Sequence, residues 1–276
     1  MSVSTETNSA NILLRIVEQR RGSIAHRKRV LPLAALKLAV EKKSPPARDF
    51  AAALTGGEWN VIAELKKASP SRGILREDYR PATLAPGMQQ AGAAALSILT
   101  EEDFFQGSLA HLKEARKLVE IPVLRKDFIV DPWQVWEARA AGADSFLLIT
   151  AVLEDCDLKD LLALGRQLEM EALVEVHTRE ELTRALSAGA MVVGINNRDL
   201  RTFEVRLETS LELVGAIPDD CVAVSESGIR SREDMERLRR AGFDAFLIGE
   251  QLMARPDPVA ALAELTGSPV SGAREA

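Results

Sequence analysis

The stretch AGAAALSILT at residues 91–100 recurs in altered form three more times, as AGADSFLLIT at 141–150, AGAMVVGINN at 188–197 and AGFDAFLIGE at 241–250. Each copy reads as a helix end at glycine, a short apolar strand and a polar strand end. The copies recur at a period of roughly 50 residues, which is the length of two β/α units. The chain is therefore predicted to repeat a strand-and-helix unit.

Four more apolar runs lie between these copies and complete the strand pattern. VIAELK begins at Val61, IPVLRK at Ile121, ALVEV at Ala172 and VAVSE at Val222. Eight strands that alternate with helices over about 250 residues are typical of a closed parallel barrel surrounded by helices. We therefore predict an α/β protein, a (β/α)8 TIM barrel that forms the catalytic domain over residues 59–265.

The segment ahead of the first strand has a different pattern. Apolar residues recur at helical spacing from Ile12 to Val17, in an arginine-rich segment that runs to Pro32. A helix that binds a membrane surface or a partner would show a similar pattern, but we favour docking on the barrel. We expect residues 1–58 to form a helical extension packed on the barrel and residues 266–276 to form a disordered tail.

The composition excludes several classes of protein. The chain has 276 residues, of which 46% are hydrophobic and 28% are charged, and its net charge of −6 argues against a nucleic-acid partner. No apolar run approaches the length of about 18 residues that a membrane span needs, and no signal peptide is evident. We expect a cytoplasmic protein that neither binds nucleic acid nor enters a membrane.

Cysteine and histidine residues show no pattern that suggests a disulfide framework or a metal site. Cys156 and Cys221 are two widely spaced thiols, which is consistent with a reducing compartment. The histidines His26, His111 and His177 lack the spacing of metal ligands. We expect these histidines to be solvated or packed side chains and predict no metal.

Polar and charged side chains stand at the carboxyl ends of five predicted strands. They are Glu64 and Lys66 on the first strand, Lys126 on the third, Glu175 on the fifth, Asn196 on the sixth and Glu226 on the seventh. Parallel barrel strands are otherwise apolar, so these residues either form structural ion pairs or converge on a ligand. Because catalytic residues of such barrels come from several strand ends, we favour a polar active site.

The chemistry of these strand ends allows several roles. Either Lys66 or Lys126 could be a proton donor, a substrate anchor or a Schiff-base nucleophile. Glu175 lies in an apolar strand, as a general acid or base often does, or it pairs with a lysine across the barrel mouth. The aromatic residues Phe105 and Phe128 follow strand ends and could wall a flat ring or pack against helices.

Glycines mark a candidate phosphate site. Ser227-Gly228 follows the seventh strand and Gly249-Glu250 follows the eighth. Loops at these two positions frequently bind phosphate in barrels, because glycine allows close backbone approach and the N–H groups carry positive partial charge. The long loop at 67–81, rich in Ser, Pro, Gly and Arg, is predicted to be a binding loop or a lid.

Seven motifs in a fixed order extend these observations. They are Ala63-Glu64-Leu65-Lys66 with Ser69-Pro70-Ser71, Leu99-Thr100-Glu101 with Phe104-Phe105-Gln106-Gly107-Ser108, Leu124-Arg125-Lys126-Asp127-Phe128, Leu173-Val174-Glu175-Val176, Gly194-Ile195-Asn196-Asn197-Arg198-Asp199-Leu200, Ser225-Glu226-Ser227-Gly228-Ile229 and Phe246-Leu247-Ile248-Gly249. Together they resemble the indole-3-glycerol phosphate synthase family of tryptophan biosynthesis. The resemblance runs from near Asn11 to near Ala260 and includes the helical extension.

The resemblance implies a carbon–carbon lyase. Its substrate would be 1-(2-carboxyphenylamino)-1-deoxyribulose 5-phosphate, and its products indole-3-glycerol phosphate, carbon dioxide and water, with no metal or organic cofactor. Lys126 matches the general acid of ring closure, and Glu175 matches the proton carrier of the later dehydration. Lys66 matches a residue that holds the anthranilate carboxylate and moves protons. The division of acid work between the two lysines stays open.

The resemblance also assigns supporting roles. Glu64, Asn196 and Glu226 would orient the reacting groups and bind hydroxyls of the intermediate. The phosphate side would include Ser69, Ser227, Gly228 and Gly249, with Arg198 on the neighbouring rim and Phe105 and Phe128 as the aromatic wall. The chain departs from the family at Ala68, where a basic residue is frequent, and at Glu250, where a serine is common. We expect Glu250 to contribute only its backbone N–H to the phosphate.

Other functions remain open from the sequence. A Schiff-base aldolase also uses lysines at barrel strand ends. A phosphosugar isomerase would need an acid and a base without this rim of two lysines. A catalytically silent barrel that binds a phosphorylated ligand is the alternative that is not an enzyme. In each case the predicted partner is a phosphorylated small molecule, and we expect a monomer or a weak homo-oligomer.

Overall fold

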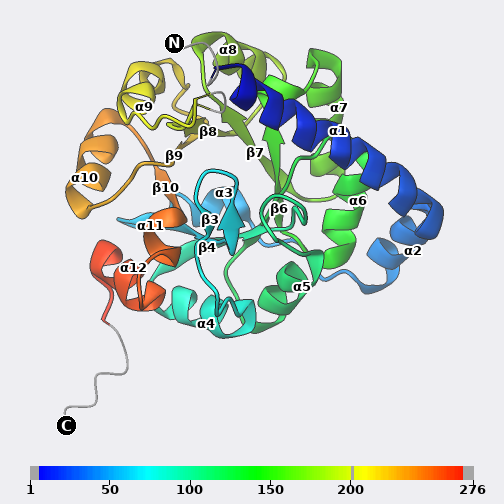
Figure 1. Ribbon diagram of the computed structural model, residues 1–276, viewed down its shortest axis with the longest axis horizontal. Helices are drawn as coiled ribbons and strands as arrows, with labels where there is room; N and C mark the ends of the chain where they lie inside the picture. Colours follow the sequence, from blue (N-terminus) through cyan, green and yellow to red (C-terminus); the bar gives the residue numbers. More distant parts are fainter. Residues whose placement is uncertain (1–5, 200–201, 270–276) are drawn as a thin grey trace.

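The chain folds into a closed parallel barrel surrounded by helices (Figure 1), in a computed structural model that describes residues 6–199 and 202–269. The barrel strands are β1 (Asn60–Leu65), β4 (Ala93–Leu99), β5 (Val123–Lys126), β6 (Ser145–Ile149), β7 (Glu171–Val176), β8 (Val192–Asn196), β9 (Val222–Glu226) and β10 (Ala245–Ile248). Each strand pairs with the next strand along the chain, and β10 pairs with β1 to close the barrel. All eight strands predicted from the sequence are present, so the predicted fold is confirmed.

Helices follow the strands and cover the outside of the barrel. They are α4 (Pro81–Gln90), α5 (Leu109–Leu118), α6 (Pro132–Ala141), α7 (Asp155–Gln167), α8 (Arg179–Ser187), α9 (Glu208–Leu213), α10 (Arg232–Ala241), α11 (Glu250–Met253) and α12 (Pro258–Thr266). Short 3-10 turns follow β6 (Thr150–Val152) and α9 (Val214–Ala216). Among the described residues, no helix is both long enough and apolar enough to span a bilayer.

Strand alternation decides which side chains reach the barrel mouth. Along β1, Val61 and Ala63 belong to the core between strands and helices, whereas Ile62 belongs to the core inside the barrel. Because successive strand residues point to opposite faces, Glu64 follows Ile62 onto the inner face. The same alternation on the other strands directs alternate residues inward, and the last of them lie at the mouth.

Three helices precede the barrel: α1 (Glu6–Val30), α2 (Leu33–Lys43) and α3 (Phe50–Ala53). Figure 1 shows α1 passing over the barrel toward α6, and Arg27 near its end pairs with Glu137 of α6. Helix α2 packs against α6, while Phe50 of α3 lies in the core inside the barrel. The division into an extension, a barrel and a tail stays a prediction, and residues 270–276 of that tail lie outside the described part of the chain.

The loop after β1 contains a small hairpin. Its strands are β2 (Ala68–Ser69) and β3 (Gly73–Ile74), which pair in antiparallel fashion. The Tyr79 hydroxyl donates to the backbone carbonyl of Leu65, 3.1 Å away, and fastens the end of the loop to the barrel. The loop is therefore held in place at both ends next to the mouth.

Helix α10 begins with a complete capping box, formed by Ser231 and Asp234, whereas α8 has only half of one. At α8 the Thr178 hydroxyl accepts from the Glu181 backbone N–H at 3.2 Å. The Glu181 carboxylate reaches one residue further back, where it accepts the backbone N–H of His177 at 2.7 Å and meets the imidazole as well.

Candidate active site

A pocket of about 820 Å³ opens at the carboxyl ends of the strands. The structure brings all fourteen sequence-predicted site residues to its lining: Glu64, Lys66, Ser69, Phe105, Lys126, Phe128, Glu175, Asn196, Arg198, Glu226, Ser227, Gly228, Gly249 and Glu250. Their convergence is expected from the barrel, because parallel strands present their carboxyl ends on one face.

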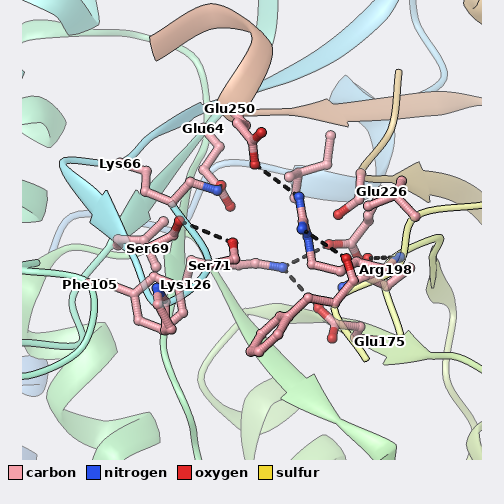
Figure 2. A pocket seen from close by; sticks show the side chains of 18 of the residues that line it. Glu64, Lys66, Ser69, Ser71, Phe105, Lys126, Glu175, Arg198, Glu226 and Glu250 are labelled. Carbon is pink, nitrogen blue, oxygen red and sulfur yellow. Dashed lines mark hydrogen bonds and ion pairs between the residues drawn. The ribbon is translucent and has the colours of Figure 1, made fainter. Parts of the chain in front are cut away.

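Lys126 lies at the centre of the pocket (Figure 2). Its Nζ is 3.0 Å from Glu175 Oε2 and 2.7 Å from Glu226 Oε2, so one ammonium bridges the ends of β7 and β9. All three side chains are buried or nearly so. Two carboxylates and one lysine give this inner cluster (Lys126, Glu175 and Glu226) a formal charge of −1 when all are ionised.

The inner cluster separates the pKa values of its two carboxyl groups. Burial disfavours the charged form of Lys126, yet the charges of Glu175 and Glu226 outweigh it and raise the lysine pKa. For Glu175 burial is outweighed in the same way by Lys126, and its pKa is lowered. Burial, with repulsion from Glu175, raises the pKa of Glu226 to about 7 despite the attraction of Lys126. Lys126 is thus a cation, and Glu226 is the carboxyl that holds a proton most readily.

A missing side chain on β8 makes room for Glu226. A Cβ atom at Gly194 would stand 2.1 Å from Glu226 Oε1, closer than any real contact. Gly194 is the register partner of Glu175 on the adjacent strand β7. The glycine therefore lets the Glu226 carboxylate lean toward Glu175 and share Lys126 with it.

Glu64 and Lys66 form a second ion pair at the mouth. Lys66 Nζ lies 2.7 Å from Glu64 Oε1, and both side chains are mostly buried. The pair stands beside β10, because a Cβ at Gly249 would be 2.4 Å from that same carboxylate oxygen. The second lysine is therefore fixed by a carboxylate from its own strand, separately from Lys126.

The predicted phosphate side combines a tight backbone with charged side chains. Ser227 and Gly228 have φ values of 66° and 79°, a left-handed conformation that favours glycine. The carboxylate of Glu250 pairs with Arg198 at 2.9 Å and with Arg72 at 3.0 Å. Its charge is thus neutralised from two loops, a pairing that the expectation of a backbone-only role for Glu250 did not include.

The opposite wall of the pocket is apolar. The rings of Phe105 and Phe128 lie with centroids 6.1 Å apart at an interplanar angle of 40°. Ile12, Leu13 and Ile16 of α1 also line the pocket. A flat aromatic group would thus contact side chains from the barrel on one side and from the N-terminal extension on the other.

Sequence reasoning missed several polar residues near this site, among them Ser71, Arg72 and His177. Ser71 and Arg72 of the hairpin loop line the pocket, and Ser71 Oγ is 3.4 Å from Ser69 Oγ. His177 lies next to the pocket floor, with Nε2 3.4 Å from Glu175 Oε1. Alternation could have identified His177, because it stands two residues after Glu175 on the same face. No comparable periodicity applies to the loop residues.

The fold and this mouth define a class of protein, the (β/α)8-barrel enzymes that work with charged strand ends. Comparison with known proteins gives the family within that class. The family model for indole-3-glycerol phosphate synthase matches residues 13–265. The chain belongs to the indole-3-glycerol phosphate synthase family.

Similar proteins of known name agree with this assignment. An indole-3-glycerol phosphate synthase of Albidiferax ferrireducens is 49% identical over 259 residues, which cover 92% of this chain and 98% of the relative. One of Acidithiobacillus ferrooxidans is 48% identical with the same coverage. One of Polaromonas naphthalenivorans is 48% identical over 262 residues, or 94% of this chain and 99% of the relative.

Solved structures with low sequence identity share the fold alone. Thiamine phosphate pyrophosphorylase from Pyrococcus furiosus superposes with a TM-score of 0.57 at 16% identity, covering 75% of this chain and 93% of that one. A 3-hexulose-6-phosphate synthase gives 0.57 at 15% identity, covering 76% of this chain and 99% of that one. These likenesses agree with the barrel and carry no argument about the reaction.

Proposed function

We propose that this protein converts 1-(2-carboxyphenylamino)-1-deoxyribulose 5-phosphate to indole-3-glycerol phosphate, with release of carbon dioxide and water, in tryptophan biosynthesis. Family membership supports the activity. One structural observation carries the assignment of roles: the buried Lys126 ammonium, held between Glu175 and Glu226 beside an aromatic wall. The pocket offers a cation for a developing oxyanion and an apolar surface for the ring.

Ring closure needs an acid at the ketone. As the aromatic carbon attacks, negative charge develops on the carbonyl oxygen, and a positioned ammonium can stabilise it and donate a proton. Lys126 is the group for this step because its raised pKa keeps it protonated. Lys66, paired with Glu64, is placed to hold the carboxylate of the substrate until it leaves as carbon dioxide.

Dehydration needs a base and an acid together. Glu175 is an ionised carboxylate with a lowered pKa. We assign to it the role of the base that removes the proton from the carbon next to nitrogen. We assign to Glu226, whose pKa is raised to about 7, the proton that the departing hydroxyl takes, and Asn196 stands beside it to orient that hydroxyl. Two carboxyl groups of different pKa on one lysine can thus serve different proton-transfer steps.

The phosphate would bind at the far side of the pocket from the aromatic wall. Backbone N–H groups of Ser227, Gly228 and Gly249 are the expected donors, with Ser69 and Arg198 nearby. A side chain at Gly228 would meet Val205 Cγ1 at 2.6 Å and would strain a φ of 79°. At position 228 only glycine therefore fits without rearrangement, and the absence of a side chain there leaves the backbone N–H open to an anion.

The alternative reactions fit the inner cluster less well. A Schiff-base aldolase needs a neutral lysine as the nucleophile. Lys126 is bound by two carboxylates that raise its pKa, which keeps its lone pair protonated. A silent binding barrel would have no use for a buried cluster with unequal pKa values.

We further infer that the enzyme works in the cytoplasm on this phosphorylated small molecule, as a monomer or a weak homo-oligomer. A fluorescence assay tests the activity, because indole-3-glycerol phosphate fluoresces as its ring forms. Purified protein given the carboxyphenylamino sugar phosphate should produce that signal, and borohydride should trap no covalent adduct. A trapped adduct, or no indole product, would overturn the proposed reaction.

A further inference from the structure

The proposed reaction consumes protons that the active site must recover. During ring closure a carbon–carbon bond forms and the ketone oxygen takes one proton. Carbon dioxide then leaves, and its bonding electron pair restores the aromatic ring. In dehydration the hydroxyl takes a second proton and leaves as water, while one proton is lost from carbon. Each turnover therefore takes up one proton from solvent, which must reach the buried cluster of Lys126, Glu175 and Glu226.

A line of titratable side chains leads from Lys126 toward the outside. Glu175 faces Lys126 through Oε2, at 3.0 Å, and faces His177 through its other oxygen, Oε1, 3.4 Å from Nε2. His177 Nδ1 lies 3.2 Å from Glu181 Oε2. Glu181 stands on the first turn of α8 and is partly exposed. Lys126, Glu175, His177 and Glu181 thus form a continuous series.

The imidazole is placed between the two glutamates with one free nitrogen. His177 Nε2 is buried and has no hydrogen-bond partner among the described residues, although it points to within 3.4 Å of Glu175. A shift of a few tenths of an ångström would complete that hydrogen bond. Glu181 binds both the backbone N–H and the ring of His177, which fixes the orientation of the imidazole.

The charges around His177 favour a protonated ring. Burial opposes its charged form, but the hydrogen bond to Glu181 and the charges of Glu175, Glu181 and Glu226 outweigh it and raise its pKa. A histidine in this setting can hold a proton near neutral pH and release it to a neighbouring carboxylate. It can therefore take a proton at Nδ1 and release one from Nε2.

We propose that Glu181 and His177 form a proton relay that returns the missing proton to the inner cluster through Glu175 after each turnover. This proposal rests on the proposed function. After dehydration Glu175 holds the proton taken from carbon, and its carboxyl group rotates and gives that proton to Lys126. The ionised Glu175 then accepts at Oε1 a proton that His177 releases from Nε2, while Glu181, protonated by solvent, resupplies His177 at Nδ1. Glu175 passes this proton on through Lys126 to Glu226, which gave its own to the departing hydroxyl. His177 and Glu181 are not among the residues that line the pocket, so bound substrate does not block this path.

The relay predicts a distinctive kinetic pattern for His177→Gln. Glutamine keeps hydrogen-bonding groups in place but cannot carry a proton at neutral pH. The first turnover uses protons already on the enzyme and should keep its rate. Steady-state turnover, which requires the inner cluster to be reset, should fall about ten- to a hundredfold. Stopped-flow indole fluorescence would show a burst of one product per enzyme followed by a slow phase.

Two further variants separate proton transfer from packing. In His177→Ala, added imidazole should restore steady-state turnover in proportion to its concentration, with little effect on the Michaelis constant. Glu181→Gln should slow steady state as His177→Gln does. Glu180→Gln is the matched control, because Glu180 is the preceding residue of α8 and is exposed. It should behave as the unaltered protein.

Each outcome has a distinct meaning. If the unaltered protein makes no indole product, the proposed function fails. If it turns over normally and His177→Gln matches it in both phases, the relay is wrong and the function stands. A variant that slows the first turnover as much as steady state, without imidazole rescue, would assign His177 a packing role and would also overturn the relay.

Discussion

Two buried ion clusters are built around neighbouring residues at the end of the same strand, and they differ in the ratio of cationic to anionic side chains. The side chain of Lys126 points into the barrel and forms the inner cluster with Glu175 and Glu226. Its neighbours Arg125 and Asp127 belong to an outer cluster between barrel and helices, which consists of Arg20, Arg27, Arg125, Asp127 and Glu137. Because successive strand residues point to opposite faces, side chains that are adjacent in the sequence belong to two separate ion clusters.

The outer cluster is rich in partners. Arg125 Nη2 lies 2.9 Å from both Asp127 and Glu137, and its Nη1 donates to the backbone carbonyl of Gln134 at 3.0 Å. Arg20 of α1 pairs with Asp127, so this cluster fastens the extension to the barrel. Three arginines serve two carboxylates, and the pKa of Asp127 is lowered.

The inner cluster has the opposite imbalance. One lysine serves two carboxylates, Glu175 and Glu226. Glu226, whose pKa burial raises to about 7, is therefore partly protonated near neutral pH, whereas Asp127 in the outer cluster stays ionised. We infer that a surplus of cations serves stability here, and that a deficit of cations keeps protons available for the proposed chemistry.

The largest expected effect comes from Lys126→Ala. Loss of the acid that serves ring closure should lower the rate by about 10² to 10⁴, with the fold and substrate affinity largely kept. Single-turnover indole fluorescence measures the rate, and circular dichroism checks the fold. Near-normal turnover would remove Lys126 from the mechanism and erase the distinction between the clusters.

Arg125→Met should lower the stability of the fold and leave the turnover rate close to normal, the reverse of Lys126→Ala. It removes the buried arginine that bridges Asp127 and Glu137 and leaves them only Arg20 and Arg27 of α1, and breaking such a network costs about 3–5 kcal/mol of unfolding free energy. Denaturant unfolding measures that loss, while the turnover rate of the folded fraction should stay close to normal. If Arg125→Met instead lowers the turnover rate and spares stability, the outer cluster is part of the catalytic machinery.

Glu175→Gln should damage dehydration. The amide is nearly isosteric but cannot take the proton, so a rate loss of about 10² is expected at this step. Rapid-quench analysis should show a ring-closed intermediate that accumulates. Weak substrate binding with unchanged chemistry would make Glu175 an anchor.

Glu226→Gln tests the shortage of cations in the inner cluster through the pH dependence of the Tm. Because folding raises the pKa of Glu226 to about 7, its carboxyl stabilises the fold at low pH and loses that contribution as pH rises from its unfolded value through about 7. The glutamine does not titrate. The Tm of the variant minus that of the unaltered protein should therefore increase between about pH 5 and about pH 8, by on the order of 5 °C. A difference that stays constant with pH would show that Glu226 remains ionised.

The smallest effect is expected at the exposed rim, from Glu250→Ser. Its partner Arg72 is 65% exposed, and ion pairs of this kind contribute about 0.2–1 kcal/mol. The change should free Arg72 and Arg198 for the substrate anion, so the Michaelis constant should stay equal or fall. Inhibition by inorganic phosphate should strengthen in parallel. A sharp rise in the Michaelis constant would show that Glu250 holds these arginines in their working position.

The sequence was sufficient to predict the fold and the location of the site. Copies of one β/α unit imply a barrel, and period-two alternation then brings Glu64, Lys126, Glu175 and Glu226 to one mouth. These predictions follow from geometry that every strand of a closed barrel obeys. The convergence of the fourteen residues is therefore a consequence of the fold.

Partners that depend on loop paths and side-chain rotamers were beyond the sequence. The spacing of Glu250 from Arg72 and Arg198 contains no sign that the three would meet. The Glu181 carboxylate accepts the backbone N–H of His177 and lies 3.2 Å from its ring nitrogen Nδ1, contacts that the sequence does not indicate. The roles of the site residues and the domain limits stay predictions.

Gly194 contributes no side-chain group to the site, yet its position limits which mutations the protein can accept in evolution. A codon for glycine becomes one for alanine by a single base change, and the added methyl group would collide with Glu226 Oε1. The carboxylate, whose other oxygen binds Lys126, would have to shift, so the smallest inherited alteration would disturb the inner cluster. Selection should therefore tolerate many exchanges on the outer surface of the barrel and very few at this empty position.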